Sequence, residues 1–163
     1  LNRPVEEVTG RGAGLTSEGL ARKIQVIAEA IEMHQPDPED VIDVLSKVGG
    51  LDIAGLTGVF LGGAIYHVPI IVDGFISAVA ALCAVRIKKE VEDYLIPSHV
   101  SKEPAGSMLL EALSLSPLIH CNMCLGEGTG AVAVIPLIEM GLRVYREMAT
   151  FDQVEFETYQ VLK

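Results

Sequence analysis

One carboxylate stands in a stretch of the chain that has almost no side-chain bulk. Glu127 lies between two glycines in the segment LGEGTG, Leu125 to Gly130, and the apolar run AVAVIPLIEMGLRVYREM follows it. Such a stretch suits a phosphate cradle built from backbone N–H groups, a turn with a helix cap, or a catalytic base with room for substrate beside it. The residue types alone leave these three alternatives open.

The expected position of Glu127 at the start of a helix bears on this choice. The positive end of the helix dipole stabilises an ionised carboxylate, whereas burial raises the pKa of such a group. These opposed effects can bring a carboxyl group into the range in which it acts as a general base. An acid that only caps the helix remains the alternative interpretation.

A second glycine-rich stretch, TGRGAGL, precedes a predicted helix that carries Lys23. Glycines such as Gly12 let backbone N–H groups approach a phosphate closely, and Lys23 would add a positive charge. Neither the spacing GxGxxG of dinucleotide-binding turns nor the Walker spacing that ends in Gly-Lys-Ser/Thr is present. The stretch is therefore either a phosphate or ribose site or an ordinary loop.

Polar residues also follow two short apolar runs. After the first, Asp73 either caps the next helix or lines a site, and Gly74 lets a ligand approach the backbone. After the second, the segment SHVSKEP holds Ser98, His99 and Ser101, but no Gly-x-Ser-x-Gly elbow surrounds either serine. We therefore expect no catalytic triad, and hydrogen bonds from Ser101 to a bound ligand are the better interpretation.

The segment HCNMC places His120, Cys121 and Cys124 close together. A metal site needs a further ligand, and no second Cys-x-x-Cys or distant pair of histidines completes one. We expect no metal here and predict buried thiols beside the site.

Helical periodicity defines the first part of the chain. LTSEGLARKIQVIAEAIEMH predicts a helix with isoleucines on one face and Thr16 or Ser17 as its N-cap. PDPEDVIDVLSKVGG predicts a second helix, which we expect Asp37 to cap and Gly49 or Gly50 to end.

The remaining segments alternate between helix and strand. In order, they predict a helix over about 52–66, a strand over 68–72, a helix over 76–90, a strand in DYLIPSHVS, a helix over about 107–113, a weaker strand in PLIHCNM and a helix over about 130–148. This alternation predicts an α/β fold of three layers, Rossmann-like, with a mainly parallel sheet and flanking helices. Because ligands bind at the carboxyl ends of parallel strands, residues 73–74, 98–101 and 125–130 are expected to line one crevice.

Composition restricts the class of protein further. A chain of 163 residues that is half hydrophobic can form one domain with a substantial core, and a net charge of −10 argues against nucleic-acid binding. Three cysteines provide no disulfide framework, which favours a reduced, cytoplasmic setting. No signal peptide is expected, because the first ten residues are polar. The apolar stretch from Ile53 to Val72 is interrupted by His67 and Pro69, so a buried helix and strand are favoured over a membrane span.

Several long motifs resemble one known family. VGGLDIAGLTGVFLGGA, VPIIVDGFISAVAAL, LIPSHVSKEP, LGEGTGAVAVIPL and EMATF, together with EEVTGRGAGL and LARKIQVI, are similar to nicotinate-nucleotide–dimethylbenzimidazole phosphoribosyltransferases. The resemblance implies transfer of the phosphoribosyl group of nicotinate mononucleotide to 5,6-dimethylbenzimidazole, which gives α-ribazole 5′-phosphate and nicotinate on the route to the lower ligand of cobalamin. It also implies a homodimer and no metal or other cofactor.

The same resemblance assigns roles to individual residues. Glu127 matches the family's general base, and Leu125 matches a position beside the aromatic base. Four residues match positions that contact the nucleotide, with Asp73 as a less certain neighbour: Gly12, Lys23, Gly74 and Ser101.

The resemblance runs from the first residues to about Phe151. Family chains are longer and carry a GEMGIGNTT-type motif upstream, which is absent here. We therefore expect residues 1–150 to be the C-terminal part of an α/β phosphoribosyltransferase domain and residues 151–163 to be a tail. A non-catalytic nucleotide-binding or dimerisation module of the same fold is the alternative.

Overall fold

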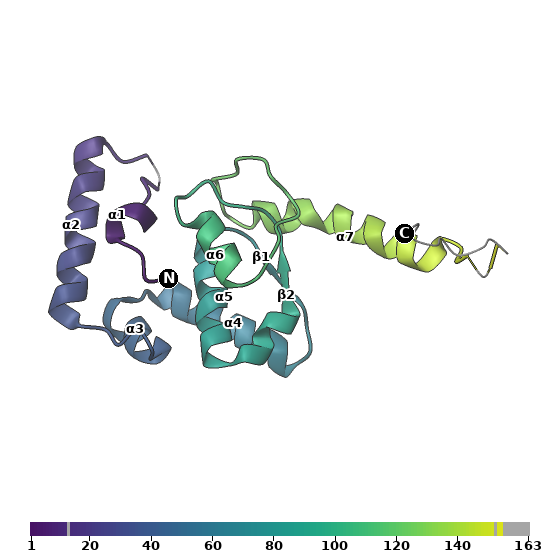
Figure 1. Ribbon diagram of the computed structural model, residues 1–163, viewed down its shortest axis with the longest axis horizontal. Helices are drawn as coiled ribbons and strands as arrows, with labels where there is room; N and C mark the ends of the chain where they lie inside the picture. The colour runs from purple at the N-terminus through teal and green to yellow at the C-terminus, as the bar shows by residue number, and fades with distance from the viewer. Residues whose placement is uncertain (13, 152, 155–163) are drawn as a thin grey trace, which may run out of the picture.

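A computed structural model describes residues 1–12, 14–151 and 153–154 (Figure 1). Helices make up most of the described chain, and two short strands lie near its middle. In order, the elements are α1 (Val5–Val8), α2 (Ser17–His34), α3 (Val41–Val48), α4 (Leu51–Ile65), β1 (Ile70–Val72), α5 (Phe75–Ile87), the 3-10 helix η1 (Lys89–Tyr94), β2 (Leu95–Pro97), α6 (Gly106–Ala112) and α7 (Thr129–Glu147).

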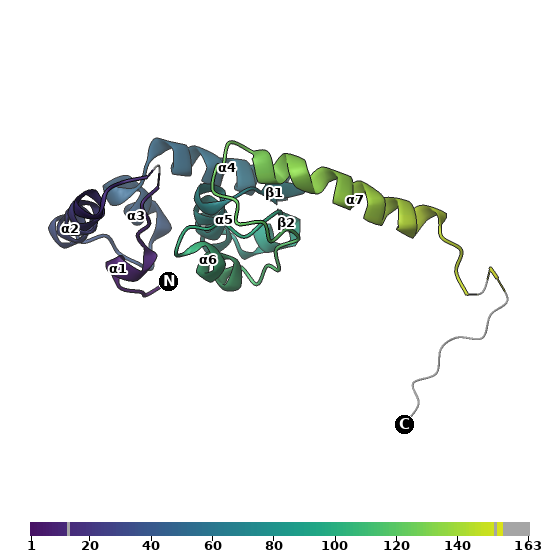
Figure 2. The ribbon, with the colours of Figure 1, turned by 90° about the horizontal axis from the view of Figure 1, so that it is seen from above.

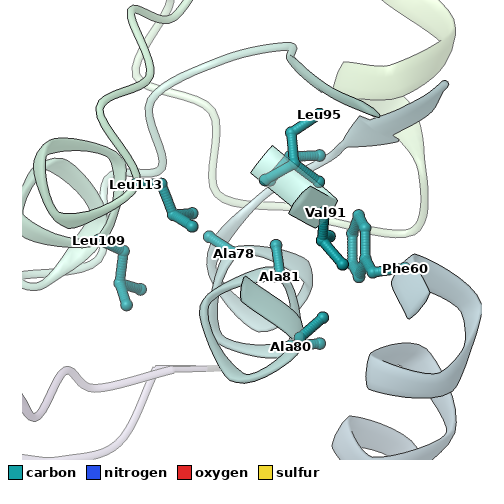
Figure 3. Close-up of a cluster of buried hydrophobic side chains, with 10 residues drawn as sticks. Phe60, Ala78, Ala80, Ala81, Val91, Leu95, Leu109 and Leu113 are labelled. Atoms are coloured by element: carbon teal, nitrogen blue, oxygen red, sulfur yellow. The ribbon is translucent and has the colours of Figure 1, made fainter. Parts of the chain in front are cut away.

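The hydrophobic core lies where α4, α5 and α6 pack around the two strands. Helix α5 contributes small residues, among them Ala80, Ala81 and Ala84, which are fully buried and let α4 approach closely. Phe60 of α4 lies against Val91 of η1 on one side of α5, and leucines of α6 and the turn after it lie on the other (Figure 3). This cluster forms the hydrophobic core of the described chain.

The two strands pair in parallel, as the apolar sequence of both predicts. Ile70 pairs with Leu95, and Val72 pairs with Pro97. The α/β class with parallel pairing is therefore confirmed, although the sheet among the described residues has two strands. The strand expected in PLIHCNM is absent there: Ile119 forms only an isolated parallel bridge with His99.

Helices α2, α4, α6 and α7 begin and end within two residues of their expected bounds. The helix expected over 76–90 ends earlier, at Ile87, and neither η1 after it nor the short α1 was predicted. Thr16 caps α2, because its side chain accepts a hydrogen bond from the amide of Gly19. Asp37 was the wrong cap for α3: Asp40 accepts from the first amides of that helix, whereas Asp37 accepts from the amide of Glu39 in the turn before it. Two aspartates three residues apart both suit a cap, and only the path of the chain between them selects one.

Two long helices lie at the periphery. In the described part of the chain, α2 has no buried residue, and the buried residues of α7 are Gly130 and Val134. Helix α7 points away from the rest of the molecule in both views (Figures 1 and 2). None of the helices in the described ranges is long and apolar enough to cross a membrane.

The tail expected over residues 151–163 lies mostly outside the described residues. Thr150, Phe151, Gln153 and Val154 form a turn after α7, with the amide of Val154 donating to the carbonyl oxygen of Thr150 at 3.2 Å. The division of the chain at residue 150 stays a prediction.

Candidate active site

A cavity of about 810 Å³ opens at the carboxyl ends of the two strands. Three segments that follow β1, β2 and the bridge at Ile119 reach it, and the chain ahead of α2 closes another side. All seven residues singled out from the sequence line this cavity: Gly12, Lys23, Asp73, Gly74, Ser101, Leu125 and Glu127. The structure thus brings together residues that lie up to 115 positions apart in the chain, from Gly12 to Glu127.

Glu127 lies on a turn with an unusual backbone. Gly126, Glu127 and Gly128 have φ angles of +75°, +56° and +76°, so all three adopt the left-handed conformation. Glycine adopts it freely, but for a residue with a Cβ it costs about 1 kcal/mol. The side chain of Glu127 is exposed and forms no hydrogen bond with any described residue, and it does not cap α7. The described chain therefore does not bury this carboxylate.

The cap of α7 is Asp73, which lies 55 residues earlier in the sequence than the N-cap residue. Its Oδ2 accepts a hydrogen bond from the amide of Gly128 at 3.2 Å, and its Oδ1 accepts one from the amide of Ala131 at 2.9 Å. Of the two alternatives for Asp73, a cap of the next helix, α5, is therefore wrong, whereas Asp73 does line the cavity. Ser77 instead accepts from the amide of Gly74 at the start of α5.

Ser98 and His99 form a buried polar layer beneath the cavity. The Ser98 hydroxyl lies 2.7 Å from the carbonyl oxygens of both Val72 and Asp73, and 3.1 Å from Nδ1 of His99. Since the hydroxyl has one proton, which it donates to these carbonyls, it accepts a hydrogen bond from Nδ1. The imidazole of His99 lies against Gly74 and Gly130, and a Cβ on Gly130 would collide with it.

Sequence reasoning underestimated His99 and missed Glu103. Both line the cavity, and His99 is only 3% exposed. The signal for His99 was the segment SHVSKEP, where its place directly after a strand put it at the expected crevice. Glu103 lies against Gly10 of the first glycine-rich stretch, and nothing in the local sequence indicated that contact.

Lys23 brings a positive charge to the cavity. Its Nζ donates a hydrogen bond to the carbonyl oxygen of Gly10 at 2.9 Å and lies next to Gly12, whose φ is +56°. Among the described residues, Lys23 is the only lysine or arginine that lines the cavity. This end of the cavity is therefore suited to an anionic group of a ligand.

Ser101, Gly74 and Leu125 occupy other parts of the wall. Ser101 is half-buried, and its hydroxyl accepts a weak hydrogen bond from the amide of Glu103 at 3.3 Å, which leaves its proton available. Gly74 lies beneath the imidazole of His99. Leu125 is 72% exposed and forms an apolar rim next to Glu127.

The prediction of buried thiols beside the site is wrong. Cys121 and Cys124 are exposed, and Cys124 lines the cavity, because the segment that carries them forms a loop on the surface instead of a strand. Cys83 of α5 is half-buried, and this burial raises the pKa of its thiol. Within the described ranges, no group of three or more histidines, cysteines and carboxylates could hold a metal ion.

The cavity combines an apolar wall with a few polar groups. Phe60, Phe75 and Ile70 are among its apolar residues, whereas the Glu127 carboxylate and the Lys23 ammonium are charged groups on other elements. Such a site can hold a ligand with a flat apolar ring and an anionic group, and can remove one proton from it.

Comparisons with known proteins agree with this chemistry. A family described as phosphoribosyltransferase matches residues 1–155. A nicotinate-nucleotide–dimethylbenzimidazole phosphoribosyltransferase of Clostridium acetobutylicum is 52% identical over 160 residues, which are 98% of this chain and 46% of that protein. A relative of the same name from Ruminiclostridium cellulolyticum is 48% identical over 163 residues, again 46% of its length. The chain thus spans about half the length of the curated relatives it matches.

Solved structures give the same result. A crystal structure of CobT from Thermus thermophilus superposes with a TM-score of 0.87 at 37% identity, over 96% of this chain and 46% of that one. A second structure from that organism, titled as the nicotinate-nucleotide–dimethylbenzimidazole enzyme, superposes with a TM-score of 0.84 at 36% identity. The chain belongs to the nicotinate-nucleotide–dimethylbenzimidazole phosphoribosyltransferase family.

Proposed function

We propose that this chain contributes the general base and part of the nucleotide site of an enzyme that transfers phosphoribosyl groups. The donor is nicotinate mononucleotide, the acceptor is 5,6-dimethylbenzimidazole, and the products are α-ribazole 5′-phosphate and nicotinate. The names of two relatives that match this chain over most of its length state the nicotinate nucleotide, the dimethylbenzimidazole and the phosphoribosyl transfer.

The proposal rests on the position and backbone conformation of Glu127. Its carboxylate faces a cavity and does not cap a helix, and its backbone adopts a left-handed conformation that residues other than glycine rarely adopt. Strained residues of this kind are concentrated at functional sites. Of the three alternatives for this segment, a catalytic base is therefore favoured over a cap.

In the proposed reaction, Glu127 removes the N–H proton of dimethylbenzimidazole. The other ring nitrogen attacks the anomeric carbon of the ribose, and the bond from that carbon to the nicotinate nitrogen breaks, with inversion at the carbon. The electron pair of the broken bond neutralises the pyridinium nitrogen, so the leaving group needs no strong acid. The main tasks of the protein are then to position both rings and to accept one proton.

The remaining residues of the cavity are proposed to bind substrates. Lys23 and Gly12 supply the positive charge and the open backbone that suit the phosphate, and Ser101 and Gly74 contact the same nucleotide. Leu125 provides an apolar surface beside the benzimidazole. Asp73 lies next to the nucleotide, and no metal or cofactor takes part in this proposal.

The test is an assay of the full-length protein with both substrates, in which α-ribazole 5′-phosphate is measured by mass spectrometry. Replacing Glu127 with Gln keeps the size of the side chain but removes the base, so we expect kcat to fall by about 10²- to 10⁴-fold. Glu139→Gln on the exposed face of α7 is the matched control and should leave kcat unchanged. Activity that survives Glu127→Gln would reject the general-base role, and a wild type without product would favour a binding module.

A homodimer in a reduced, cytoplasmic setting is part of the same proposal. Helix α7 exposes many large apolar side chains, among them Val132, Met140 and Tyr145, which a second subunit could cover. The three free thiols, two of them exposed, are compatible with a reducing compartment. Light scattering of the full-length protein should give twice the mass of one chain, and the mass of one chain would contradict the dimer.

We also infer that β1 and β2 belong to a larger, three-layered parallel sheet of Rossmann type in the whole protein. Their parallel pairing and apolar sequences support this, because such strands are normally covered on both faces. An experimental structure of the full-length protein tests it directly.

A further inference from the structure

We propose that Asp73 is a positioning residue that holds Glu127 in place in the cavity. The catalytic consequence of this inference rests on the proposed function, whereas the position of the turn that carries Glu127 depends on this chain alone. The carboxylate of Asp73 connects the end of β1 with the first amides of α7, directly after Glu127.

The turn at Glu127 requires a cap from elsewhere. The N-cap residue of α7 is Gly128, which has a φ of +76° and no side chain that could accept hydrogen bonds from the helix amides. An N-cap side chain normally accepts from the second or third amide of its helix. Here Oδ1 of Asp73 takes that role at Ala131, the third residue of α7, while Oδ2 accepts from Gly128 itself.

Asp73 is in turn fixed to the core. The hydroxyl of Ser98, which is fully buried, lies 2.7 Å from the carbonyl oxygens of Val72 and Asp73. Val72 is 2% exposed and belongs to the paired strand β1. A rigid chain of contacts therefore leads from the core through Asp73 to the turn that carries Glu127.

His99 sets the distance between the two parts that Asp73 connects. Its imidazole fills the space next to Gly74 and Gly130, and a Cβ on Gly130 would collide with the ring. The carboxylate therefore holds α7 against the imidazole, and the imidazole limits how closely α7 approaches.

Helix α7 buries few residues that could fix this turn to the rest of the described chain. Within the described chain, Gly130 and Val134 are its buried residues, and both lie in its first two turns. The rest of the helix projects outward (Figure 2).

Within the turn itself, the amide and the hydroxyl of Thr129 both donate to the carbonyl oxygen of Gly126, at 3.0 and 2.7 Å. These bonds fix the shape of the turn, and Asp73 ties the turn to β1. Without Asp73 this tie is lost, and we expect the Glu127 carboxylate to leave its position.

The position of the turn is tested by hydrogen exchange of individual amides, measured by NMR on the full-length protein. In Asp73→Ala, the amides of Gly128 and Ala131 should exchange about 5- to 30-fold faster, as expected for the loss of a helix cap. Asp40→Ala removes the equivalent cap of α3, outside the cavity, and should leave these two amides unchanged. Unchanged exchange in Asp73→Ala would overturn the proposal whether or not the protein is an enzyme.

The catalytic part is tested by kinetics of the full-length protein. In Asp73→Ala, kcat should fall about 100-fold, as for a displaced catalytic group, while the KM for nicotinate mononucleotide changes less than about 3-fold. Asp73→Asn keeps a side-chain oxygen that can accept from the amide of Ala131, so it should recover part of kcat. If Asp73→Ala does not fold, Asp73→Asn is used in its place.

A double-mutant cycle separates positioning from substrate contact. If Asp73 acts through Glu127, Asp73→Ala should lower kcat by less than about 3-fold in a protein that already carries Glu127→Gln, because the carboxylate that Asp73 positions is absent there. An equal loss in both backgrounds, with a raised KM, would show that Asp73 contacts the nucleotide and would overturn the proposal. A wild type without product rejects the proposed reaction, whereas the exchange experiment still decides on the positioning role.

Discussion

Helices α5 and α7 are both rich in small and apolar residues, yet the fold uses them in opposite ways. The 13 residues of α5 include four buried alanines, whereas the 19 residues of α7 include two buried residues in the described structure. Helix α5 is held by packing on several sides. Helix α7 is held at its first turn, by Asp73 and His99, and this turn carries the proposed base. The difference indicates that stability comes from the α4–α5 core, whereas the geometry of the site depends on a few hydrogen bonds.

The largest effect should come from the core. Phe60 is 2% exposed and packs between α5 and η1, so Phe60→Ala should lower the free energy of unfolding by about 3–5 kcal/mol. Met33 on the peripheral helix α2 is 76% exposed, and Met33→Ala should change the free energy of unfolding by less than about 0.5 kcal/mol. Urea unfolding of both variants measures this, and similar losses would contradict the division into core and periphery.

A smaller effect should distinguish the two ends of α7. Gly130→Ala places a methyl group against His99 and should lower the free energy of unfolding by about 1–3 kcal/mol. Gly141→Ala in the same helix meets no atom within 4 Å and should stabilise the helix by about 0.5–1 kcal/mol. Urea unfolding and helicity by circular dichroism measure both. Equal responses would indicate that the first turn of α7 is not anchored as described.

The smallest effect should come from an ion pair at the periphery. Hydrogen bonds from the amide of Asp37 and from Lys47 hold the pKa of Asp43 below its usual value. Because the pKa is lower in the folded chain, Asp43 stabilises the fold above its unfolded pKa, and this contribution is lost as the pH falls through the folded value. The stability difference between wild type and Asp43→Asn should therefore be small at pH 7 and vanish in acid.

The stability difference between wild type and Asp43→Asn is measured by unfolding both proteins across the acid range, together with an NMR titration of the Asp43 carboxyl group. A difference in stability that persists below the folded pKa would mean that the side chain acts through packing and not through its charge.

Local patterns predicted most of the elements and the position of the cavity. The helix over 130–148, the parallel pairing of the two apolar strands and the meeting of segments 73–74, 98–101 and 125–130 at one cavity all follow from periodicity and from the geometry of parallel strands. Within these segments, the cavity is lined by Asp73, Gly74, His99, Ser101 and residues 125–128. The lone carboxylate at Glu127 was recognisable because it stands between glycines. These features depend on residues that are close in sequence or on rules common to all parallel sheets.

The wrong predictions share a different cause. A cap of α5 was one of two alternatives for Asp73, which instead caps α7. Asp37 was expected to cap α3 and Asp40 does so, and Cys121 and Cys124 were expected to be buried and are exposed. In each case the local sequence permits both outcomes. Contacts with other segments, or the path of the loop, choose between them.

The residue order alone places a single acid in an open, glycine-rich turn before a helix and assigns this turn to the strand ends. That the acid does not cap its own helix follows from contacts between distant segments. That cap comes from Asp73, because the pairing of β1 with β2 and the imidazole of His99 bring the end of β1 within hydrogen-bonding distance of an amide 58 residues away. Local spacing cannot encode such a contact, since it depends on how the packed elements meet.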